Sequence, residues 1–301
     1  MIKTKNYRVG FVAILGAPNV GKSTLLNQLI GTKVSIVSPK VQTTRVKVLG
    51  IYIKNKTQII FIDTPGIFSP KRRLDRAMVA SAWHGNEDAD QTLLLVDSLH
   101  GIDDNTKDII KVFEKKNKKV ILILNKIDRV KKVKLLNLAK ELDRTGVISE
   151  IFMISALYRD GIETLVEYLE NKMDVGPWLF PEDQVSDMPE RLLAAEITRE
   201  QLYLQLHQEL PYTTTVDTES WENKKDGSIH IRQIILVERT SQKGIVLGKN
   251  GQRIKAIGES ARSELSNILN KDIHLFLFVK VQEKWSEEID RYKEWGLNFN
   301  A

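Results

Sequence analysis

Residues 16–23 read Gly16-Ala17-Pro18-Asn19-Val20-Gly21-Lys22-Ser23, which is the pattern G-x-x-x-x-G-K-S. An apolar run at 9–15 precedes it, and a helix-like run at 24–29 follows it. A strand, a glycine-rich loop and a helix form the context of a phosphate-binding loop. Gly16 and Gly21 admit backbone conformations closed to other residues, so successive N–H groups can point at phosphate oxygens. We therefore predict that Lys22 holds the β- and γ-phosphates of a nucleotide and that the Ser23 hydroxyl binds Mg²⁺.

Composition limits the classes of protein to which the chain can belong. Its 301 residues suffice for two domains, and the absence of cysteine excludes disulfides and thiolate metal sites. No run is apolar enough to span a bilayer, and no room is left for a signal peptide before the first strand, so we expect a cytosolic protein. The net charge of +6 is uneven, because residues 181–301 hold 16 basic and 20 acidic groups. The positive excess therefore belongs to the first 180 residues.

Three further motifs each follow a strand-like run. Asp63-Thr64-Pro65-Gly66 follows the run 58–62, where Asp63 can hold Mg²⁺ through water and the Gly66 N–H can reach a γ-phosphate. Asn125-Lys126-Ile127-Asp128 follows the buried-type run 120–124. A buried Asp128 carboxylate would accept hydrogen bonds from N1–H and the 2-amino group of guanine, a pair of donors that adenine lacks. Ser155-Ala156-Leu157 follows the run 150–154 and can place a backbone N–H on the guanine O6.

The order of these elements predicts a fold class. A long exposed segment at 31–45 leads to a hairpin of strands at 46–54 and 58–62, after which helices and strands alternate. This order predicts an α/β P-loop NTPase with a mostly parallel sheet and helices on both faces. The motifs together resemble those of translation-factor-type GTPases, rather than an adenine-specific kinase or ATPase. The predicted nucleotide-binding residues are Gly16, Ala17, Pro18, Asn19, Val20, Gly21, Lys22, Ser23, Thr24, Asp63, Thr64, Pro65, Gly66, Asn125, Lys126, Asp128, Ser155, Ala156 and Leu157.

One catalytic group of Ras-like GTPases is absent. They place a glutamine after D-x-x-G to orient the attacking water, and here that position is Ile67, which cannot hydrogen-bond water. The chain resembles GTPases that combine such a substitution with a loop asparagine, here Asn19, and bind K⁺ there. Asn19 can equally serve only to stabilise the loop turn. Thr43 and Thr44 could each reach Mg²⁺, and resemblance favours Thr44. The predicted catalytic residues are Asn19, Lys22 and Thr44, and the predicted metal ligands are Ser23, Thr44 and Asp63.

A second domain is predicted after a linker rich in proline and acidic residues. We predict a GTP-binding domain at 1–175, a linker at 176–190 and a second domain at 191–301. The second domain has a helix at 189–207, strands at 212–221 and 228–238, and a last strand at 273–281. Between them lie a helix, Gly248-Lys249-Asn250-Gly251 and a helix to about residue 270. This order matches a type II KH domain, a smaller α+β fold, here with a C-terminal extension.

The G-x-x-G loop of a KH domain clamps the backbone of a single-stranded nucleic acid. Although the second domain is acidic in total, residues 239–262 hold six basic side chains against Glu259 alone. Positive charge therefore concentrates at this loop, and single-stranded RNA is the expected ligand. The alternative is a plain joint between two helices with a solvated basic face. The predicted RNA-binding residues are Lys243, Gly248, Lys249, Asn250, Gly251, Arg253 and Lys255.

A GTPase followed by a type II KH domain resembles the Era family. The resemblance rests on G-A-P-N-V-G-K-S-T, Q-T-T-R, D-T-P-G-I, N-K-I-D, S-A-L and V-E-R-T-S-Q-K-G-I-V-L-G-K-N-G. It implies a Mg²⁺-dependent GTPase that hydrolyses GTP to GDP and phosphate. The family uses this switch to control binding of the 16S rRNA 3′ end during biogenesis of the 30S ribosomal subunit. It also implies a cytoplasmic monomer with weak peripheral contact to the cytoplasmic face of the inner membrane.

Two alternative functions remain open. One is a membrane-associated signalling or cell-cycle GTPase that reuses the KH fold for protein contacts. The other is an RNA-binding scaffold that holds nucleotide without turning it over. The salt dependence of RNA binding separates the first alternative from an RNA-binding GTPase, and single-turnover hydrolysis separates the second.

Overall fold

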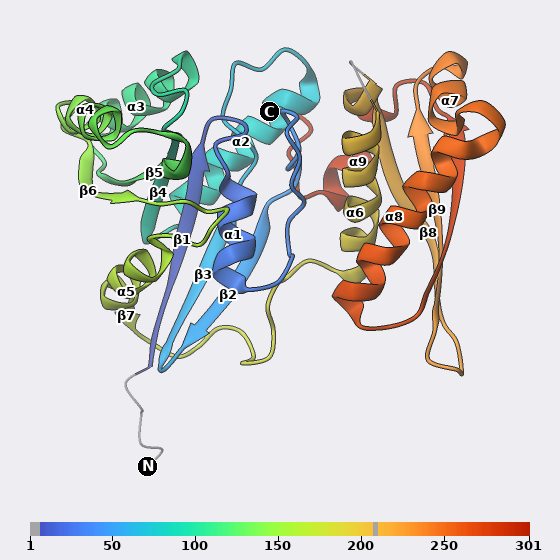
Figure 1. Ribbon diagram of the computed structural model, residues 1–301, viewed down its shortest axis with the longest axis horizontal. Coiled ribbons are helices and arrows are strands. Elements are labelled where there is room, and N and C mark those ends of the chain that lie inside the picture. Colours follow the sequence, from blue (N-terminus) through green and yellow to red (C-terminus); the bar gives the residue numbers. More distant parts are fainter. Residues whose placement is uncertain (1–6, 207–209) are drawn as a thin grey trace. The chain divides into compact units, whose positions relative to one another are not determined.

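The computed structural model describes residues 7–206 and 210–301 (Figure 1). The chain divides into two compact units. Within the described residues, the first unit comprises 7–35, 44–187 and 292–301, and the second comprises 36–43, 188–206 and 210–291. Each unit is built around its own β-sheet.

The first unit has a mostly parallel sheet with the strand order β2-β3-β1-β4-β5-β6. Only β2, and the short β7 beside β1, run antiparallel to their neighbours. The predicted P-loop NTPase fold is therefore confirmed. The strands are β1 (Arg8–Gly16), β2 (Val48–Lys54), β3 (Thr57–Asp63), β4 (Gln91–Asp97), β5 (Val120–Asn125), β6 (Ile148–Met153) and β7 (Asp174–Val175).

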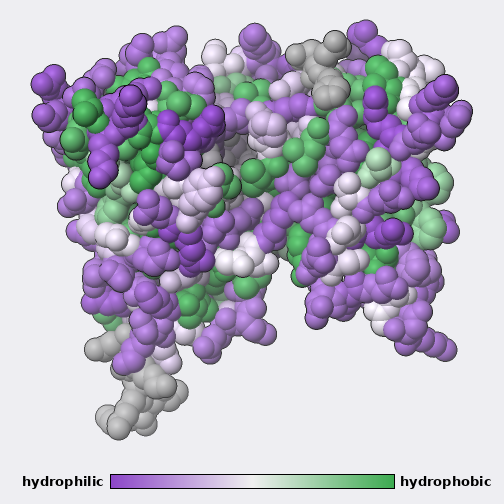
Figure 2. Space-filling model, in the orientation of Figure 1, coloured by the Kyte–Doolittle hydropathy of each residue, from purple (hydrophilic) through white to green (hydrophobic). Residues whose placement is uncertain are grey.

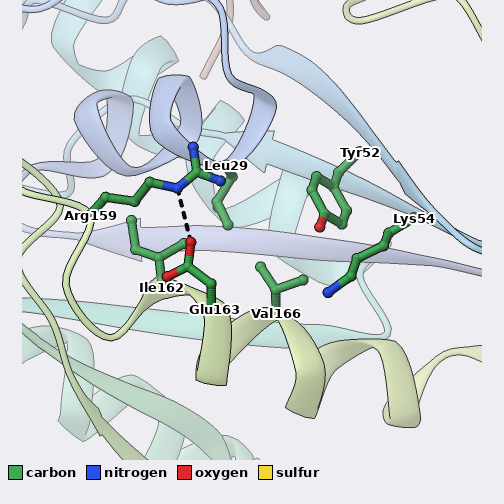
Figure 3. A pocket seen from close by; sticks show the side chains of 7 residues that line it. All are labelled: Leu29, Tyr52, Lys54, Arg159, Ile162, Glu163 and Val166. Carbon is green, nitrogen blue, oxygen red and sulfur yellow. Dashed lines mark hydrogen bonds and ion pairs between the residues drawn. The ribbon is translucent and has the colours of Figure 1, made fainter.

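Helices cover both faces of this sheet. One cluster of buried side chains joins α2, α3 and α4 to alternate residues of β4 and β5, such as Leu94 and Leu122. The residues between them, such as Leu93 and Ile121, are equally buried, so the opposite face is covered as well. There α1 and α5 meet β2 around a small pocket that Tyr52 helps to line (Figure 3). The helices are α1 (Lys22–Ile30), α2 (Arg73–Glu87), α3 (Asp104–Lys116), α4 (Lys132–Asp143) and α5 (Ile162–Lys172).

The second unit has a three-stranded sheet with the order β10-β9-β8, in which β9 runs parallel to β10 and antiparallel to β8. Helices α6 and α8 pack on one face of this sheet through two apolar clusters. Mostly hydrophilic side chains cover the side of α8 that faces the viewer in Figure 2. The elements are α6 (Glu190–Gln205), β8 (Thr214–Asn223), β9 (Ile229–Val237), α7 (Thr240–Leu247), α8 (Gln252–Leu269) and β10 (Ile273–Val281). This order is that of the predicted KH domain.

Element ends differ from the prediction by a few residues. The helix predicted to reach 207 ends at Gln205, and position 207 itself lies outside the described residues. The strand predicted from residue 212 begins at Thr214, because Leu210–Thr213, which contains a proline, forms a turn of 3₁₀ helix. A 3₁₀ turn at Trp285–Glu287 and a short helix, α9 (Ile289–Glu294), follow the last strand.

The division into units differs from the predicted one because two segments join the unit that is remote from them in sequence. Residues 36–43 belong to the second unit, where Ile36 is buried in an apolar cluster with Ala194 and Ile197 of α6. Residues 292–301 belong to the first unit. There the Arg73 guanidinium lies 4.3 Å from the ring centroid of Phe299. Packing between residues far apart in sequence therefore decides the unit to which these two segments belong, whereas the predicted domain boundary rested on composition alone.

Within 7–206 and 210–301, no helix combines the length and the apolar character that crossing a bilayer requires.

Candidate nucleotide and nucleic-acid sites

The predicted phosphate loop connects β1 to α1 and adopts the backbone conformations that its glycines allow. Gly21 has a φ of 102°, and a Cβ atom there would lie 2.4 Å from Nδ2 of Asn125. Gly16 packs equally closely, since a Cβ would lie 2.5 Å from the Leu95 carbonyl oxygen. Asn19 is exposed and left-handed, with a φ of 61°, a conformation that asparagine tolerates better than most residues. This conformation accounts for an asparagine at position 19 without any ion.

Lys22 is buried at the base of the loop. Its Nζ donates hydrogen bonds to the carbonyl oxygens of Gly16, at 3.2 Å, and Ala17, at 2.9 Å. Burial lowers the pKa of Lys22 to about 8, although the nearby Asp63 charge acts in the opposite direction. A buried ammonium held only by carbonyl groups is costly, so an anion brought to the loop gains a strong partner.

The three predicted metal ligands meet at the start of α1. The Ser23 hydroxyl donates to Oδ2 of Asp63 at 2.7 Å and lies 2.8 Å from the Thr44 hydroxyl oxygen. Asp63 is fully buried, and its other oxygen, Oδ1, has no hydrogen-bond partner among the described residues. Burial raises the pKa of Asp63, while hydrogen bonds from Ser23 and Ser35 and the charge of Lys22 lower it. A buried carboxylate with an unpaired oxygen beside two hydroxyls fits a hard cation such as Mg²⁺.

The two candidate threonines lie in different places. Thr44 is buried beside Ser23, as described above. Thr43 donates its hydroxyl to the Lys40 carbonyl at 2.7 Å and lies 2.6 Å from the Ser38 hydroxyl, so it stays within the 36–43 segment. Sequence analysis did not single out Ser35, whose hydroxyl donates to Oδ2 of Asp63 at 2.8 Å. No local pattern marks that serine.

The guanine-type motif is tied to the phosphate loop by Asn125, which is almost fully buried. Its Nδ2 donates to the Val20 carbonyl at 2.8 Å, and its Oδ1 accepts from the Ala156 N–H at 2.9 Å. Lys126 makes a second tie, donating to the Asn19 carbonyl at 2.8 Å and to Asp97 at 2.7 Å. Both polar atoms of the Asn125 side chain are therefore used to hold its own loop to the phosphate loop and to the loop at Ala156.

Asp97 was missed by sequence analysis although it ends β4, at the same edge of the sheet as the other motifs. It is mostly buried and pairs with Lys126. Burial opposes its ionisation, but hydrogen bonds from Lys126 and His100 keep the pKa of Asp97 below its ordinary value. An acidic residue at the carboxyl end of a buried strand was the one signal that could have found it.

The prediction that Asp128 is buried is wrong. Asp128 is exposed because it lies in a 3₁₀ turn, Ile127–Arg129, beyond the end of β5. Oδ1 of Asp128 accepts a hydrogen bond from the Ser155 hydroxyl at 2.5 Å, which orients the carboxylate. The Ala156 N–H is taken by Asn125, while Leu157 is largely exposed. The carboxylate thus stands open at the rim of this loop cluster.

The D-x-x-G motif packs against the phosphate loop. Thr64 donates its hydroxyl to the Ile14 carbonyl at 2.8 Å, and a Cβ at Gly66 would lie 3.0 Å from Pro18. The Ile67 N–H donates to the Gly16 carbonyl at 3.1 Å. The Ile67 side chain is buried in the apolar cluster of the sheet, so it can neither contact nor orient a water at a phosphate.

In the second unit, the predicted RNA loop is a sharp turn between α7 and α8. Gly248, Asn250 and Gly251 all have positive φ values, and a Cβ at Gly248 would lie 2.7 Å from Cβ of Arg253. Lys249 and Asn250 are exposed at its tip, before the N-terminus of the 18-residue helix α8, which favours anions.

The basic side chains near this turn differ in their partners. Arg253 donates to the Ile245 carbonyl at 3.0 Å, so it also caps the end of α7. Nζ of Lys255 lies 3.9 Å from Oε1 of Glu259, and both side chains are exposed. Lys243 is partly buried on α7. Lys249 at the tip is therefore better exposed to a ligand than Arg253 or Lys243.

Two family models match the chain. Residues 11–126 match a family described as 50S ribosome-binding GTPase, and residues 209–286 match the KH domain. The phosphate loop, the Ser23–Thr44–Asp63 cluster and the loop cluster around Asn125 lie within or beside the first match. These features define the class of protein as a GTPase joined to a KH domain.

Relatives and solved structures narrow this class. GTPase Era of Brucella suis is 56% identical over 97% of this chain and 94% of its own length, and GTPase Era of Sinorhizobium medicae is 54% identical over 97% and 94%. A structure of an Aquifex aeolicus Era variant bound to GDP·AlF₄⁻ aligns with a TM-score of 0.91 and 41% identity, covering 96% of this chain and 99% of that one. Era with MgGDPNP and nucleotides 1506–1542 of 16S ribosomal RNA aligns with a TM-score of 0.91, 42% identity and the same coverage. The chain belongs to the Era family of GTPases.

Proposed function

We propose that this protein hydrolyses GTP to GDP and phosphate and uses its nucleotide state to control binding of the 16S rRNA 3′ end during assembly of the small ribosomal subunit. The observation that carries the proposal is the likeness to Era in complex with MgGDPNP and a 16S rRNA fragment, which extends over both units. The exposed Lys249 in a G-x-x-G turn supports an RNA contact in the second unit.

Hydrolysis is proposed to rest on positioning and charge. Ser23, Thr44 and the unpaired oxygen of Asp63 would hold Mg²⁺, which neutralises charge on the phosphates when it is bound. Lys22 would leave the loop carbonyls and bind phosphate oxygens, and the loop N–H groups would bind others. Because the Ile67 side chain is buried in the apolar cluster of the sheet, the residue after D-x-x-G cannot orient the attacking water, and intrinsic turnover should be slow.

The base is proposed to be guanine. The Asp128 carboxylate, oriented by Ser155, can accept both the N1–H and the 2-amino group. The Ala156 N–H is already used by Asn125, so the N–H of the next residue, Leu157, is the better donor for the guanine O6.

The link from nucleotide to RNA is proposed to pass through residues 36–44. Thr44 contacts Ser23 in the first unit, while the preceding carbonyl, of Thr43, accepts a hydrogen bond from Arg199 of α6 at 2.5 Å in the second unit. A movement of Thr44 toward Mg²⁺ would therefore be passed to α6 through one peptide bond.

Further contacts hold the same segment on α6. Glu200 accepts the Val37 N–H at 2.7 Å, and Lys40 donates to the Leu206 carbonyl. Residues 36–43 therefore belong to the unit that would bind RNA, whereas the next residue, Thr44, belongs to the nucleotide site.

Binding of the RNA fragment 1506–1542 in the presence of GDP or a non-hydrolysable GTP analogue tests the proposal. We expect at least a fivefold difference between the two states and a steep loss of affinity with added salt. Equal affinities in both states would overturn the switch, and no RNA binding would favour the signalling alternative. Single-turnover hydrolysis with and without the RNA rules out the scaffold alternative if GTP is consumed.

We also propose that K⁺ bound near Asn19 stimulates hydrolysis, because the chain lacks the usual glutamine. Turnover in KCl should then exceed turnover in NaCl, and Asn19→Ala should abolish the difference. Equal rates in the two salts would leave Asn19 with only its turn-forming role. The site of action proposed is the cytoplasm, and flotation with vesicles of inner-membrane lipid composition tests the weak peripheral membrane contact.

A further inference from the structure

The sheet of the second unit has one face packed by helices and one face that is largely open. Apolar residues of β10 such as Ile273, Leu275 and Leu277 point into the clusters under α6 and α8. Alternate residues point the other way. In Figure 1, α6 and α8 lie in front of β8 and β9, so this second face is turned away from the viewer. We call it the outer face and define it by His230, Arg232, His274, Phe276, Phe278 and Lys280.

The outer face exposes two aromatic rings side by side along one strand. Phe276 is 45% exposed and Phe278 is 54% exposed. Large aromatic side chains that alternate on an open strand are costly to leave in water unless something covers them. The rings continue onto β9, because the His230 ring lies 4.5 Å from His274 and 6.1 Å from Phe276, centroid to centroid. The result is a contiguous row of flat rings across two paired strands.

The charge of the outer face is positive. Arg232 and Lys280 are both exposed, and neither forms an ion pair with any residue in the described part of the chain. Two acidic neighbours on β8 are paired, Asp217 with Arg291 at 2.5 Å and Glu222 with Lys224 at 2.6 Å, whereas Glu219 is exposed at the bulge beside Ser220, the residue opposite Arg232. Next to the rings, Oδ2 of Asp272 lies 3.6 Å from Nε2 of His274, and Glu222 lies opposite His230 on β8. Aromatic rings next to cations without ion-pair partners suit a nucleic acid, because the rings can stack on its bases and the cations can bind its phosphates.

The far end of this face is closed by the chain itself. Trp285 is fully buried and donates its indole N–H to the Thr213 carbonyl at 3.0 Å, and Arg291 holds Asp217 of β8. Leu236, which points outward on β9, is buried at that end. The open part is therefore limited to the half of the sheet that carries the rings.

The edge strand joins the outer face to the G-K-N-G turn. β10 is an outer strand of the sheet, and both α7 and α8, which flank the turn, contact it. A strand of RNA that leaves the turn can therefore pass over the edge of β10 and reach Phe276 and Phe278 without crossing another element of this sheet.

We propose that the outer face is a second contact for single-stranded RNA, on which bases stack against Phe276 and Phe278 while Arg232 and Lys280 hold phosphates. This inference rests on the proposed RNA-binding function and extends the RNA path beyond the G-K-N-G turn. Stacking on aromatic side chains tolerates any base sequence, so the face adds affinity rather than sequence selection.

The test compares Phe276→Leu/Phe278→Leu with Phe276→Tyr/Phe278→Tyr, using RNA 1506–1542 and the full chain. Leucine keeps apolar area but removes stacking, whereas tyrosine keeps the ring. We expect the leucine pair to lower RNA affinity about tenfold or more and the tyrosine pair to stay within about twofold of the unchanged protein. Leu136→Ala, which trims an exposed side chain of α4, is the matched control and should have no effect. The salt dependence should lose about one unit of slope in Arg232→Ala.

Wild-type affinity in the leucine pair would overturn the proposal, as would equal losses in the leucine and tyrosine pairs. A leucine pair that keeps RNA affinity but loses vesicle or protein binding would assign the face to that partner instead. Lys249→Glu separates this proposal from the function on which it rests. If that variant loses RNA and the leucine pair does not, only the outer face fails; if the unchanged protein binds no RNA, the function fails.

Discussion

Replacing Glu196 with glutamine should destabilise the second unit by about 2–4 kcal/mol. Glu196 and Arg199 form a buried pair on α6, with Nε of Arg199 donating to Oε1 of Glu196 at 2.7 Å and Nη2 donating to Oε2. The Arg199 side chain is 1% exposed. Burial alone would lower the pKa of Arg199, but the Glu196 carboxylate keeps it above its ordinary value, so the guanidinium stays charged.

The magnitude follows from leaving that charge without a counterion. Removing one member of a buried pair costs about 3–5 kcal/mol, because the other charge stays desolvated. Glutamine has nearly the same volume and keeps one acceptor oxygen, which returns about 1 kcal/mol. Nη1 of Arg199 already lacks a hydrogen-bond partner among the described residues, so the guanidinium has few other acceptors to offset the loss of the carboxylate. With a urea slope of about 2 kcal/mol per M, the midpoint of the affected transition should fall by about 1–2 M.

Urea unfolding of the full chain measures this change, and hydrogen–deuterium exchange should show faster exchange in α6. Glu259→Gln is the matched control, since it makes the same substitution in an exposed pair with Lys255, 3.9 Å apart, in the same unit. That control should change the free energy of unfolding by less than about 0.5 kcal/mol. If both variants lower the free energy of unfolding by less than about 0.5 kcal/mol, the Glu196–Arg199 pair does not stabilise α6 or the 36–43 segment.

Three further predictions concern the nucleotide site. The pKa of Lys22 is about 8, and bound phosphates favour its charged form. GTP affinity should therefore fall up to tenfold per pH unit above pH 8. Guanosine has no phosphate, so its affinity, measured in parallel by calorimetry, should stay flat to pH 9. Asp128→Asn should weaken GTP binding about 100-fold by removing two charge-assisted hydrogen bonds and should favour xanthosine triphosphate; unchanged base preference in competition binding would contradict the role of Asp128. Asn125→Ala should destabilise the first unit by about 2–4 kcal/mol, because Val20 and Ala156 each lose a buried partner, and a loss below about 1 kcal/mol on urea unfolding would disagree.

Much of the nucleotide site could be predicted because its motifs depend on local backbone chemistry. The phosphate loop needs glycines at positions 16 and 21, and their spacing from Lys22 and Ser23 is fixed along the chain. The last strand of the second unit, 273–281, has the predicted bounds, and its alternate apolar residues pack into the clusters under α6 and α8. These features are decided within a few residues of each other.

Other features could not be predicted because they depend on partners far away in sequence. Ser35 and Asp97 join the site only when the strand ends come together, and neither lies in a recognisable motif. Asp128 was expected to be buried, but a turn beyond the strand exposes it. Thr43 and Thr44 differ because Thr43 bonds to Lys40 and Ser38 close by in sequence, whereas Thr44 meets Ser23, which is 21 positions away.

By itself the sequence determined the class of each domain and the motifs that gather around the phosphate loop, because glycine spacing, strand ends and carboxylates carry that chemistry locally. Only the tertiary structure decided that residues 36–43 pack with the KH unit and residues 292–301 with the GTPase unit. Burial of Ile36 and pairing of Thr43 with Arg199 join residues more than 150 positions apart, and no local pattern encodes such a contact. The same holds for the outer face, whose rings and cations come together only when β9 and β10 pair in register.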